Sequence, residues 1–272
     1  MTKNVLVVGD TSYIGKAFMA YAQGVNVHGV SARENAWENA HWENIHTVLH
    51  CAGLAHVPQK KHMQSQYHHI NCKLAVEVAT YSKAKGVGQF IFLSSMAAHG
   101  NPKAGDMYAQ SKLAAEKALE KLNCPSFKVC IIRPPMVYGP GCKGNFPKLV
   151  KLVHRLPAFP NVPQQQRSMI YIDNLSQCIL QLIINNQGGL HLPQNTEYVN
   201  TTHLAQLIAQ YTGKNLRTTT LFNPFIHGLK GIVPPISKLF GNLVYPQESS
   251  NATYHVVPFE ESVRRSVEHE NS

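Results

Sequence analysis

Short runs rich in β-branched and other apolar residues alternate with helix-like segments through the first half of the chain. We expect strands at 4–8, 25–30, 47–53, 89–95 and 127–133. Amphipathic segments over 66–85 and 108–122 lie between the later runs. Continuous apolar strands separated by helices indicate a sheet covered on both faces, because parallel strands need crossover connections. The sequence therefore predicts an α/β chain with a doubly wound parallel sheet.

The alternation weakens beyond residue 145, where prolines become frequent. We expect a first domain over 1–145, with 165–186 completing it, and a smaller mixed lobe formed mostly by 146–272. Residues 31–46 are too few and too polar for a long crossover helix, so this connection is expected to be abbreviated. No apolar run approaches the ~18 to 20 residues of a membrane span. Because the N-terminus also lacks the pattern of a signal peptide, we expect a cytoplasmic protein with no membrane span.

The charge and the metal-binding residue types limit the partners. The formal net charge is +10, but the 25 Lys and Arg are spread along the chain rather than gathered in a block. This distribution favours a phosphate-bearing small molecule over nucleic acid. Fifteen histidines and six cysteines occur without a paired ligand motif such as H-E-x-x-H or C-x-x-C. We therefore expect no nucleic-acid partner and no metal.

A glycine-containing turn connects the first strand to a helix-like segment. It reads GDTSYIG over residues 9–15. Backbone amides at the start of a helix can bind a pyrophosphate, and the helix dipole adds attraction. The turn resembles the Gly-x-x-Gly-x-x-Gly signature of extended short-chain dehydrogenases/reductases of the NAD-dependent epimerase/dehydratase type, with Ser12 at the middle glycine. The resemblance implies a Rossmann-type fold and NAD(P) contacts from Gly9, Ser12, Tyr13, Ile14 and Gly15; the alternative is a simple turn.

The end of the second strand bears on the choice between NAD and NADP. Ser31 stands where NAD-preferring members of this family carry an acidic residue, and Arg33 follows it. A basic residue here suits a 2′-phosphate, whereas an acid accepts from a ribose hydroxyl. We lean toward NADP(H), with Arg33 as the phosphate contact. Glu34 keeps NAD open, and Arg33 could instead be a solvated surface charge.

Two Tyr-x-x-x-Lys pairs occur, and chain order separates them. Tyr81 and Lys85 precede the strand at 89–95, whereas Tyr108 and Lys112 follow it and open the next helix. A helix places residues i and i+4 on one face, so Tyr108 and Lys112 can both face the edge of the sheet where the cofactor is expected. We therefore assign the second pair to catalysis and expect Lys112 to lower the pKa of Tyr108. By resemblance, Lys112 also contacts the nicotinamide ribose and Ser95 binds the reacting oxygen.

Further motifs resemble the same family. HCAGLAH (50–56) is similar to its H-x-A-G element, so Ala52 and Gly53 are expected to border the cofactor. Asn71 matches an Asn of the following helix, with a helix N-cap as the alternative. IIRPPMVYGPGCKGN (131–145) and QQRSMIYIDNL (165–175) resemble two later segments. The resemblance implies substrate contacts from Asn145 and Arg167. The alternatives are a helix cap for Asn145 and a surface salt bridge for Arg167. Asp173 is expected to cap a helix.

The resemblance implies an NAD(P)-dependent enzyme that acts at C4 of a nucleotide-activated sugar, as a UDP-hexose 4-epimerase or a 4-keto-reductase of surface-polysaccharide precursor synthesis. Tyr108 would be the general acid/base, Lys112 its electrostatic partner, and Ser95 a hydrogen-bond donor. The stretch 96–107 is shorter than in nucleotide-sugar relatives, which leaves the sugar unspecified. Relatives pair through the helices that match 66–85 and 108–122, so a homodimer is expected. The alternative is a catalytically weak dinucleotide-binding regulatory or scaffold protein, motivated by Ser12 and the short stretch.

Overall fold

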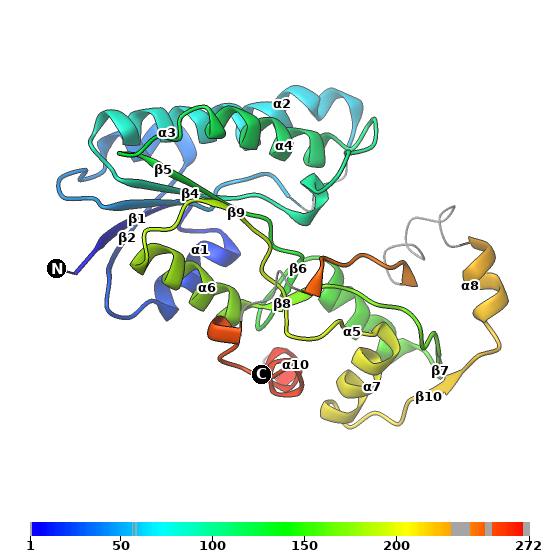
Figure 1. Ribbon diagram of the computed structural model, residues 1–272. Coiled ribbons are helices and arrows are strands. Elements are labelled where there is room, and N and C mark those ends of the chain that lie inside the picture. The colour runs from blue at the N-terminus through cyan, green and yellow to red at the C-terminus, as the bar shows by residue number, and fades with distance from the viewer. Residues whose placement is uncertain (1, 56, 58, 230–239, 248–251, 269–272) are drawn as a thin grey trace. The chain divides into compact units, whose positions relative to one another are not determined.

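The computed structural model describes residues 2–55, 57, 59–229, 240–247 and 252–268 (Figure 1). Its chain divides into two compact units. The sheet unit comprises Met1–Pro135 and Leu175–Pro193, and the second unit comprises Met136–Asn174 and Gln194–Ser272.

These boundaries differ in detail from the expected division at residue 145 and return over 165–186. The chain leaves the sheet at two consecutive prolines, Pro134 and Pro135, which cannot donate to a strand ladder. It rejoins the sheet unit at Leu175, inside a helix, rather than at residue 165.

Six parallel strands form the sheet of this unit, in the order β2-β1-β3-β4-β5-β9. They are β1 (Asn4–Val8), β2 (Asn26–Val30), β3 (Thr47–His50), β4 (Gln89–Leu93), β5 (Lys128–Ile132) and β9 (Gly189–His191). Every residue of β3 and β4 is buried, as expected for strands covered on both faces. The predicted doubly wound parallel sheet is confirmed, and β9 extends it beyond the expected strands.

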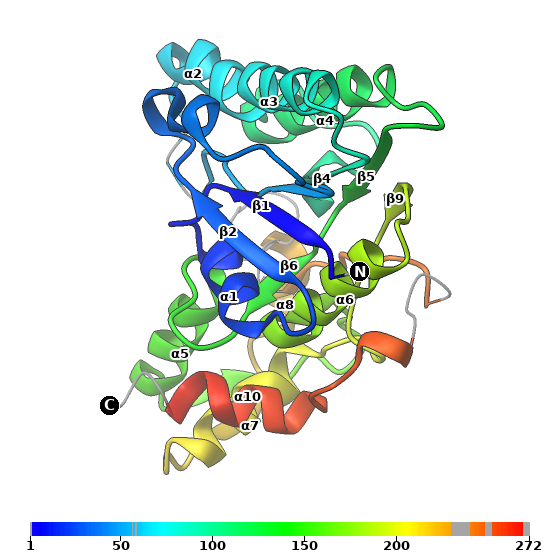
Figure 2. The ribbon, with the colours of Figure 1, turned by 90° about the vertical axis from the view of Figure 1, so that its left-hand side faces the viewer.

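Helices cover both faces of the sheet. In Figures 1 and 2, α3 (Leu74–Ala84) and α4 (Met107–Glu120) lie on one face, and α1 (Tyr13–Tyr21) and α6 (Ile172–Ile184) lie on the other. Between β2 and β3 the chain forms only the 3-10 segment η1 (Arg33–Asn39), so the abbreviated connection is also confirmed. Of the described residues, no helix is both long enough and apolar enough to cross a bilayer.

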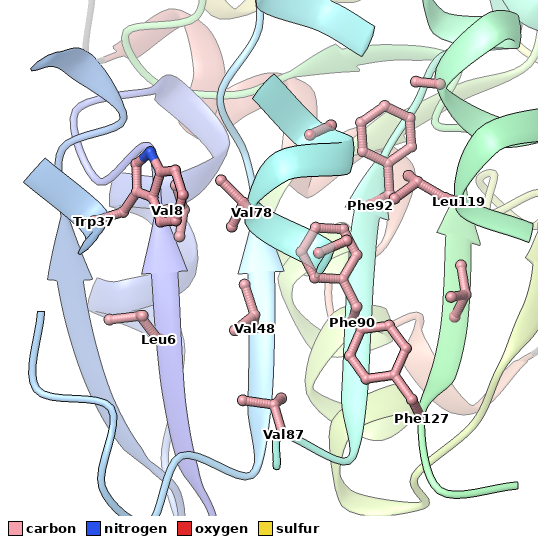
Figure 3. Close-up of a cluster of buried hydrophobic side chains, with 14 of the residues drawn as sticks. Leu6, Val8, Trp37, Val48, Val78, Val87, Phe90, Phe92, Leu119 and Phe127 are labelled. Atoms are coloured by element: carbon pink, nitrogen blue, oxygen red, sulfur yellow. The ribbon is translucent and has the colours of Figure 1, made fainter. Parts of the chain in front are cut away.

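The main core of the sheet unit lies between the sheet and the pair α3 and α4. Figure 3 shows Phe90 and Phe92 from β4 beside Val48 from β3, Val78 from α3 and Leu119 from α4. All five side chains are buried. Each buried aliphatic or aromatic side chain of this size contributes roughly 1.5–3 kcal/mol. This layer fixes α4, which carries the predicted catalytic pair, against the strands.

The helix expected over 66–85 is interrupted. It consists of α2 (Gln64–His68), a π-helical turn η3 (His69–Lys73) and α3. A π turn inserts one extra residue and shifts the face that the following residues present, and such turns are frequent at functional sites. The turn contains Asn71, one of the predicted cofactor residues.

The second unit is mixed α and β, as expected. Two small parallel sheets pair β6 with β8 and β7 with β10. Its elements are β6 (Met136–Tyr138), α5 (Asn145–Arg155), β7 (Ala158–Pro160), β8 (Met169–Tyr171), α7 (Thr201–Tyr211), β10 (Arg217–Thr219), α8 (Asn223–Leu229), η6 (Ala252–Tyr254) and α10 (Phe259–Glu268). The short 3-10 turn η4 (Met96–Ala98) belongs to the sheet unit. Tyr138 stacks on Phe146 and packs against Tyr171 in its core.

Candidate functional site

The turn between β1 and α1 requires glycine at both ends. Gly9 has φ +94°, and a Cβ added there would lie 2.6 Å from the backbone nitrogen of Ala52. A Cβ at Gly15 would lie 2.6 Å from the carbonyl oxygen of Gly9. These contacts involve backbone atoms, so no side-chain rotation could relieve them. The turn therefore packs directly on the residues that follow β3.

Ser12, at the middle position, lies in an ordinary extended conformation with φ −68°. Its Oγ accepts a hydrogen bond of 3.1 Å from the backbone amide of Gly15, so Ser12 is the N-cap of α1. The position tolerates a side chain because its φ is negative. Ser12 uses one of the amides that the first turn of a helix leaves without an intrahelical acceptor.

Replacement of Ser12 tests this capping role. Ser12→Ala is expected to lower the free energy of unfolding by about 1 kcal/mol, whereas Ser12→Gly should cost only a few tenths. Urea unfolding of the three chains would measure the difference. Equal stability of Ser12→Ala and the unsubstituted chain would contradict the cap.

Asn71 connects the loop after β3 to α4. Its Oδ1 accepts from the amide of Leu54 at 2.6 Å, and its Nδ2 donates to the carbonyl of Leu54 at 3.2 Å and to Ser111 Oγ at 3.0 Å. The interpretation of Asn71 as a helix N-cap is wrong, because the residue lies inside a π turn whose N-cap is His68. A Cβ at Gly53 would lie 3.2 Å from both Asn71 Oδ1 and Lys112 Nζ. Small residues here thus let α4 and the loop approach each other.

Ser95 and Tyr108 lie close together. Ser95 follows β4, and Asp106 caps α4 through a 3.0 Å bond from the Ala109 amide, which places Tyr108 in the first turn. The Ser95 side chain lies close to that of Tyr108 and acts to lower the pKa of the phenol. Ser95 Oγ also accepts from the amide of Ala97 at 3.2 Å, so its own proton is available to the phenol oxygen. The short stretch 96–107 therefore does not prevent this pair from forming.

The pKa of Tyr108 is raised, not lowered as we expected. Burial is the largest cause, and the hydrogen bond from Ser95 acts in the opposite direction. The ammonium of Lys112 is directed elsewhere: it donates to the carbonyl of Leu93 at 2.7 Å and lies 4.6 Å from the centre of the Phe92 ring. The lysine thus anchors α4 to the end of β4 in this structure.

Lys112 itself is a buried charge, with 4% of its surface exposed. Burial lowers its pKa to about 8, and attraction to Cys51 and Glu116 acts in the opposite direction. An ammonium with this pKa is mostly protonated at neutral pH and lies on the same helix as Tyr108, one turn further along. It can therefore stabilise negative charge that develops nearby.

The second Tyr/Lys pair lies elsewhere in the sheet unit. Tyr81 packs edge-on against Trp37 and Trp42, with ring centroids 5.3 and 5.2 Å apart, respectively. Lys85 Nζ lies 5.1 Å from the centre of the Tyr81 ring. These contacts support the interpretation of this pair as structural.

The residues near the end of β2 are exposed. The amide of Arg33 donates to Ser31 Oγ at 3.1 Å, and the Arg33 side chain faces solvent. Glu34 is also exposed and adopts a left-handed conformation with φ 54°. Either side chain is free to approach a ligand at this end of the strand.

Three predicted residues lie in the second unit, and two of the capping interpretations are wrong. Helix α5 begins at Asn145 and its cap is Gly144, so Asn145 is an exposed first-turn residue. Helix α6 begins at Ile172, so Asp173 lies within its first turn. Arg167 is buried rather than part of a surface salt bridge, and its Nη1 donates to the carbonyl of Gly241 at 3.1 Å.

The sheet unit fits a dinucleotide. The turn between β1 and α1 lies at a helix N-terminus and has two positions at which only glycine fits. The buried Lys112 of α4 lies near Gly53, in the loop after β3. These features suit a pyrophosphate and a ribose close to the backbone. Over the part of the chain that the structure describes, no group of three His, Cys, Asp or Glu side chains is arranged to hold a metal ion.

The sequence interpretation assigned no role to Glu116, although this residue contacts both strand ends beside the catalytic pair. Its Oε1 accepts from Arg133 Nε at 2.9 Å and from the Ser94 hydroxyl. The available signal was its spacing: Glu116 follows Lys112 by one helical turn, on the same face of the helix.

Comparisons with known proteins give a consistent picture. The model of the family described as "NAD dependent epimerase/dehydratase family" matches residues 5–192. A UDP-glucose 4-epimerase of Vibrio cholerae is 32% identical over 221 residues, which are 67% of this chain and 67% of that protein.

Solved structures resemble the whole chain in fold. A UDP-N-acetylglucosamine 4-epimerase from Methanobrevibacter ruminantium M1 superposes with a TM-score of 0.75 at 18% identity, covering 99% of this chain and 98% of that one. A dTDP-4-dehydrorhamnose reductase from Bacillus anthracis gives 0.69 at 18% identity, covering 98% and 99%.

Proposed function

Because the chain belongs to the NAD-dependent epimerase/dehydratase family, we propose that it is an NAD(P)-dependent enzyme acting at C4 of a nucleotide-activated sugar. A role in surface-polysaccharide precursor synthesis is part of this proposal. The observation that carries it is the proximity of Ser95 to Tyr108, with Lys112 one turn further along the same helix. The relative from Vibrio cholerae, named a UDP-glucose 4-epimerase, supports the substrate class.

The chain's residues have distinct parts in this chemistry. A bound nicotinamide dinucleotide supplies hydride acceptance and donation at carbon. Tyr108 takes the proton of the C4 hydroxyl during oxidation and returns it during reduction. Ser95, whose proton is free to be donated, bonds to the reacting oxygen, and the Lys112 ammonium stabilises the phenolate form of Tyr108.

An epimerase and a 4-keto-reductase share these residues but use the cofactor differently. An epimerase returns the hydride to the same sugar and retains NAD, whereas a reductase consumes reduced cofactor in each cycle. Mass spectrometry of the nucleotide that co-purifies, together with turnover of UDP-glucose and UDP-N-acetylglucosamine, would test the proposal. Stoichiometric bound NAD favours the epimerase, and dependence on added NADPH favours the reductase. Absence of dinucleotide binding would contradict both.

For the cofactor we favour NADP(H), with Arg33 as the contact to the 2′-phosphate. Arg33→Ala is expected to weaken NADPH binding about 10-fold or more, since a charge-assisted hydrogen bond contributes about 1.5–3 kcal/mol. Binding of NADH should change little. Isothermal titration with both cofactors would measure this, with the exposed Arg217→Ala as control. An equal effect of Arg33→Ala on NADH and NADPH would instead support NAD as the cofactor.

The alternative of a catalytically weak dinucleotide-binding scaffold was motivated by Ser12 and by the short stretch 96–107. Ser12 caps a helix, and Ser95 lies close to Tyr108 despite the short connection. Neither feature therefore favours the scaffold.

A further inference from the structure

A buried ion pair lies on the helix that carries the catalytic pair. Glu116 is 2% exposed and is bound at both its oxygens by Arg133, whose Nε lies 2.9 Å from Oε1 and 3.2 Å from Oε2. The hydroxyl of Ser94 also donates to Glu116 Oε1. A single carboxylate on α4 thus binds residues that follow two neighbouring strands, β4 and β5.

Backbone hydrogen bonds also join the ends of β4 and β5 to each other. The amide of Ser94 donates to the carbonyl of Ile132 at 2.8 Å, and the amide of Met96 donates to the carbonyl of Pro134 at 2.9 Å. Ser95 lies between these two bonds. Its backbone is therefore fixed to β5 on one side, while Ser94 fixes it to α4 through Glu116 on the other.

Stability alone is a weak explanation for such a pair. Desolvation of two charges offsets much of their attraction, so a buried ion pair can often be replaced by apolar side chains without loss of stability. Its retention is better explained by the geometry that it imposes. Here the geometry concerns three groups of the proposed reaction: the hydroxyl of Ser95, the phenol of Tyr108 and the ammonium of Lys112.

We propose that Glu116 is a positioning residue: its carboxylate holds the end of β4 against α4, so that Ser95 meets Tyr108, and it lies one helical turn from Lys112, whose ammonium it attracts. This inference rests on the proposed function, because it assigns Glu116 a part in the same reaction.

The charge effect has a definite sign. Burial lowers the pKa of Lys112 to about 8, and Glu116 opposes this decrease. Removal of the carboxylate therefore lowers the pKa further and makes Lys112 lose its proton at a lower pH. The titratable and charged groups around Lys112 on the elements packed against it are His50, Cys51, Tyr108, Glu116 and Arg133. Among these, Glu116 is the carboxylate.

Glu116→Gln tests the charge with little change of shape, and the exposed Glu120→Gln on the next turn is the matched control. The Cε resonance of Lys112, assigned by its loss in Lys112→Met, reports the lysine pKa by NMR without any turnover. We expect Glu116→Gln to lower this pKa by about 1 unit. The alkaline limb of kcat/KM should move by the same amount, and kcat should fall about 10- to 100-fold with little change in KM. An unchanged lysine pKa would overturn the inference.

A purely structural role is tested by the double variant Glu116→Leu/Arg133→Met, which removes the pair without leaving an unpaired buried charge. We expect it to fold with nearly unchanged urea stability but to remain as slow as Glu116→Gln. Recovery of full kcat in the double variant would overturn the inference, because the carboxylate would then serve only to pair Arg133. If the unsubstituted chain turns over no sugar nucleotide, the proposed function fails, whereas the NMR titration of Lys112 still decides the charge role of Glu116.

Discussion

Tyr108→Phe is expected to lower kcat by about 10²- to 10⁴-fold, the usual contribution of a positioned acid/base group. The substitution removes the phenol oxygen near Ser95 and leaves the aromatic ring in place. Cofactor binding and urea stability should change little, since the ring that fills this position is kept. Steady-state assays with the nucleotide sugar that the unsubstituted protein turns over would measure the loss.

Tyr81→Phe is the matched control for this substitution. Tyr81 begins the other Tyr-x-x-x-Lys pair, and its ring packs on Trp37 and Trp42. Turnover by Tyr81→Phe should equal that of the unsubstituted chain. If both variants kept full activity, the catalytic assignment of Tyr108 would fail.

Lys112→Met is expected to reduce activity without reducing stability at neutral pH. The prediction requires the ammonium to turn from Leu93 toward the phenolate during turnover; at about 4 Å and an effective dielectric constant near 20 their attraction is worth roughly 4 kcal/mol, which corresponds to about 10²- to 10³-fold in rate. A lysine whose pKa falls to about 8 in the folded chain destabilises it while protonated. Its removal should therefore offset the lost hydrogen bond to Leu93, which contributes about 1 kcal/mol.

The pH dependence of stability distinguishes removal of the Lys112 charge from a general loss of folding. The unfolded lysine holds its proton to higher pH than the folded one, so the free energy of unfolding of the native chain should rise above about pH 8 through this group. Lys112→Met should lack that rise. Urea unfolding between pH 7 and 10 would compare the two chains, with Lys85→Met as the exposed control. A marked loss of stability in Lys112→Met at pH 7 would contradict this account.

Periodicity and chain order predicted the features of the fold that are local. Apolar runs located five of the six strands of the sheet to within a few residues, and they are clearest for β3 and β4, which are covered on both faces and buried throughout. The order of strand, glycine turn and helix likewise located the turn at Gly9. Chain order also selected Tyr108 over Tyr81, since only the residue after β4 opens the next helix.

Features that depend on contacts between distant residues were not predictable in this way. Asn71 had the residue type of a helix cap, but it binds the backbone of Leu54, and the π turn that allows this has no clear local signature. The pKa of Tyr108 depends on its burial and on where the Lys112 ammonium points. Spacing along a helix specifies which residues share a face but not which partner each one selects.

Transfer of hydrogen from C4 of the sugar tests the central claim most directly. The protein would be incubated with UDP-glucose carrying deuterium at C4 and with oxidised NAD or NADP, and the cofactor would be analysed by mass spectrometry. The proposed function predicts that the bound cofactor gains deuterium in the unsubstituted chain and that Tyr108→Phe gains far less. If no deuterium leaves C4 of this sugar, nor of UDP-N-acetylglucosamine or dTDP-glucose labelled in the same way, while the dinucleotide is bound, the claim would be contradicted.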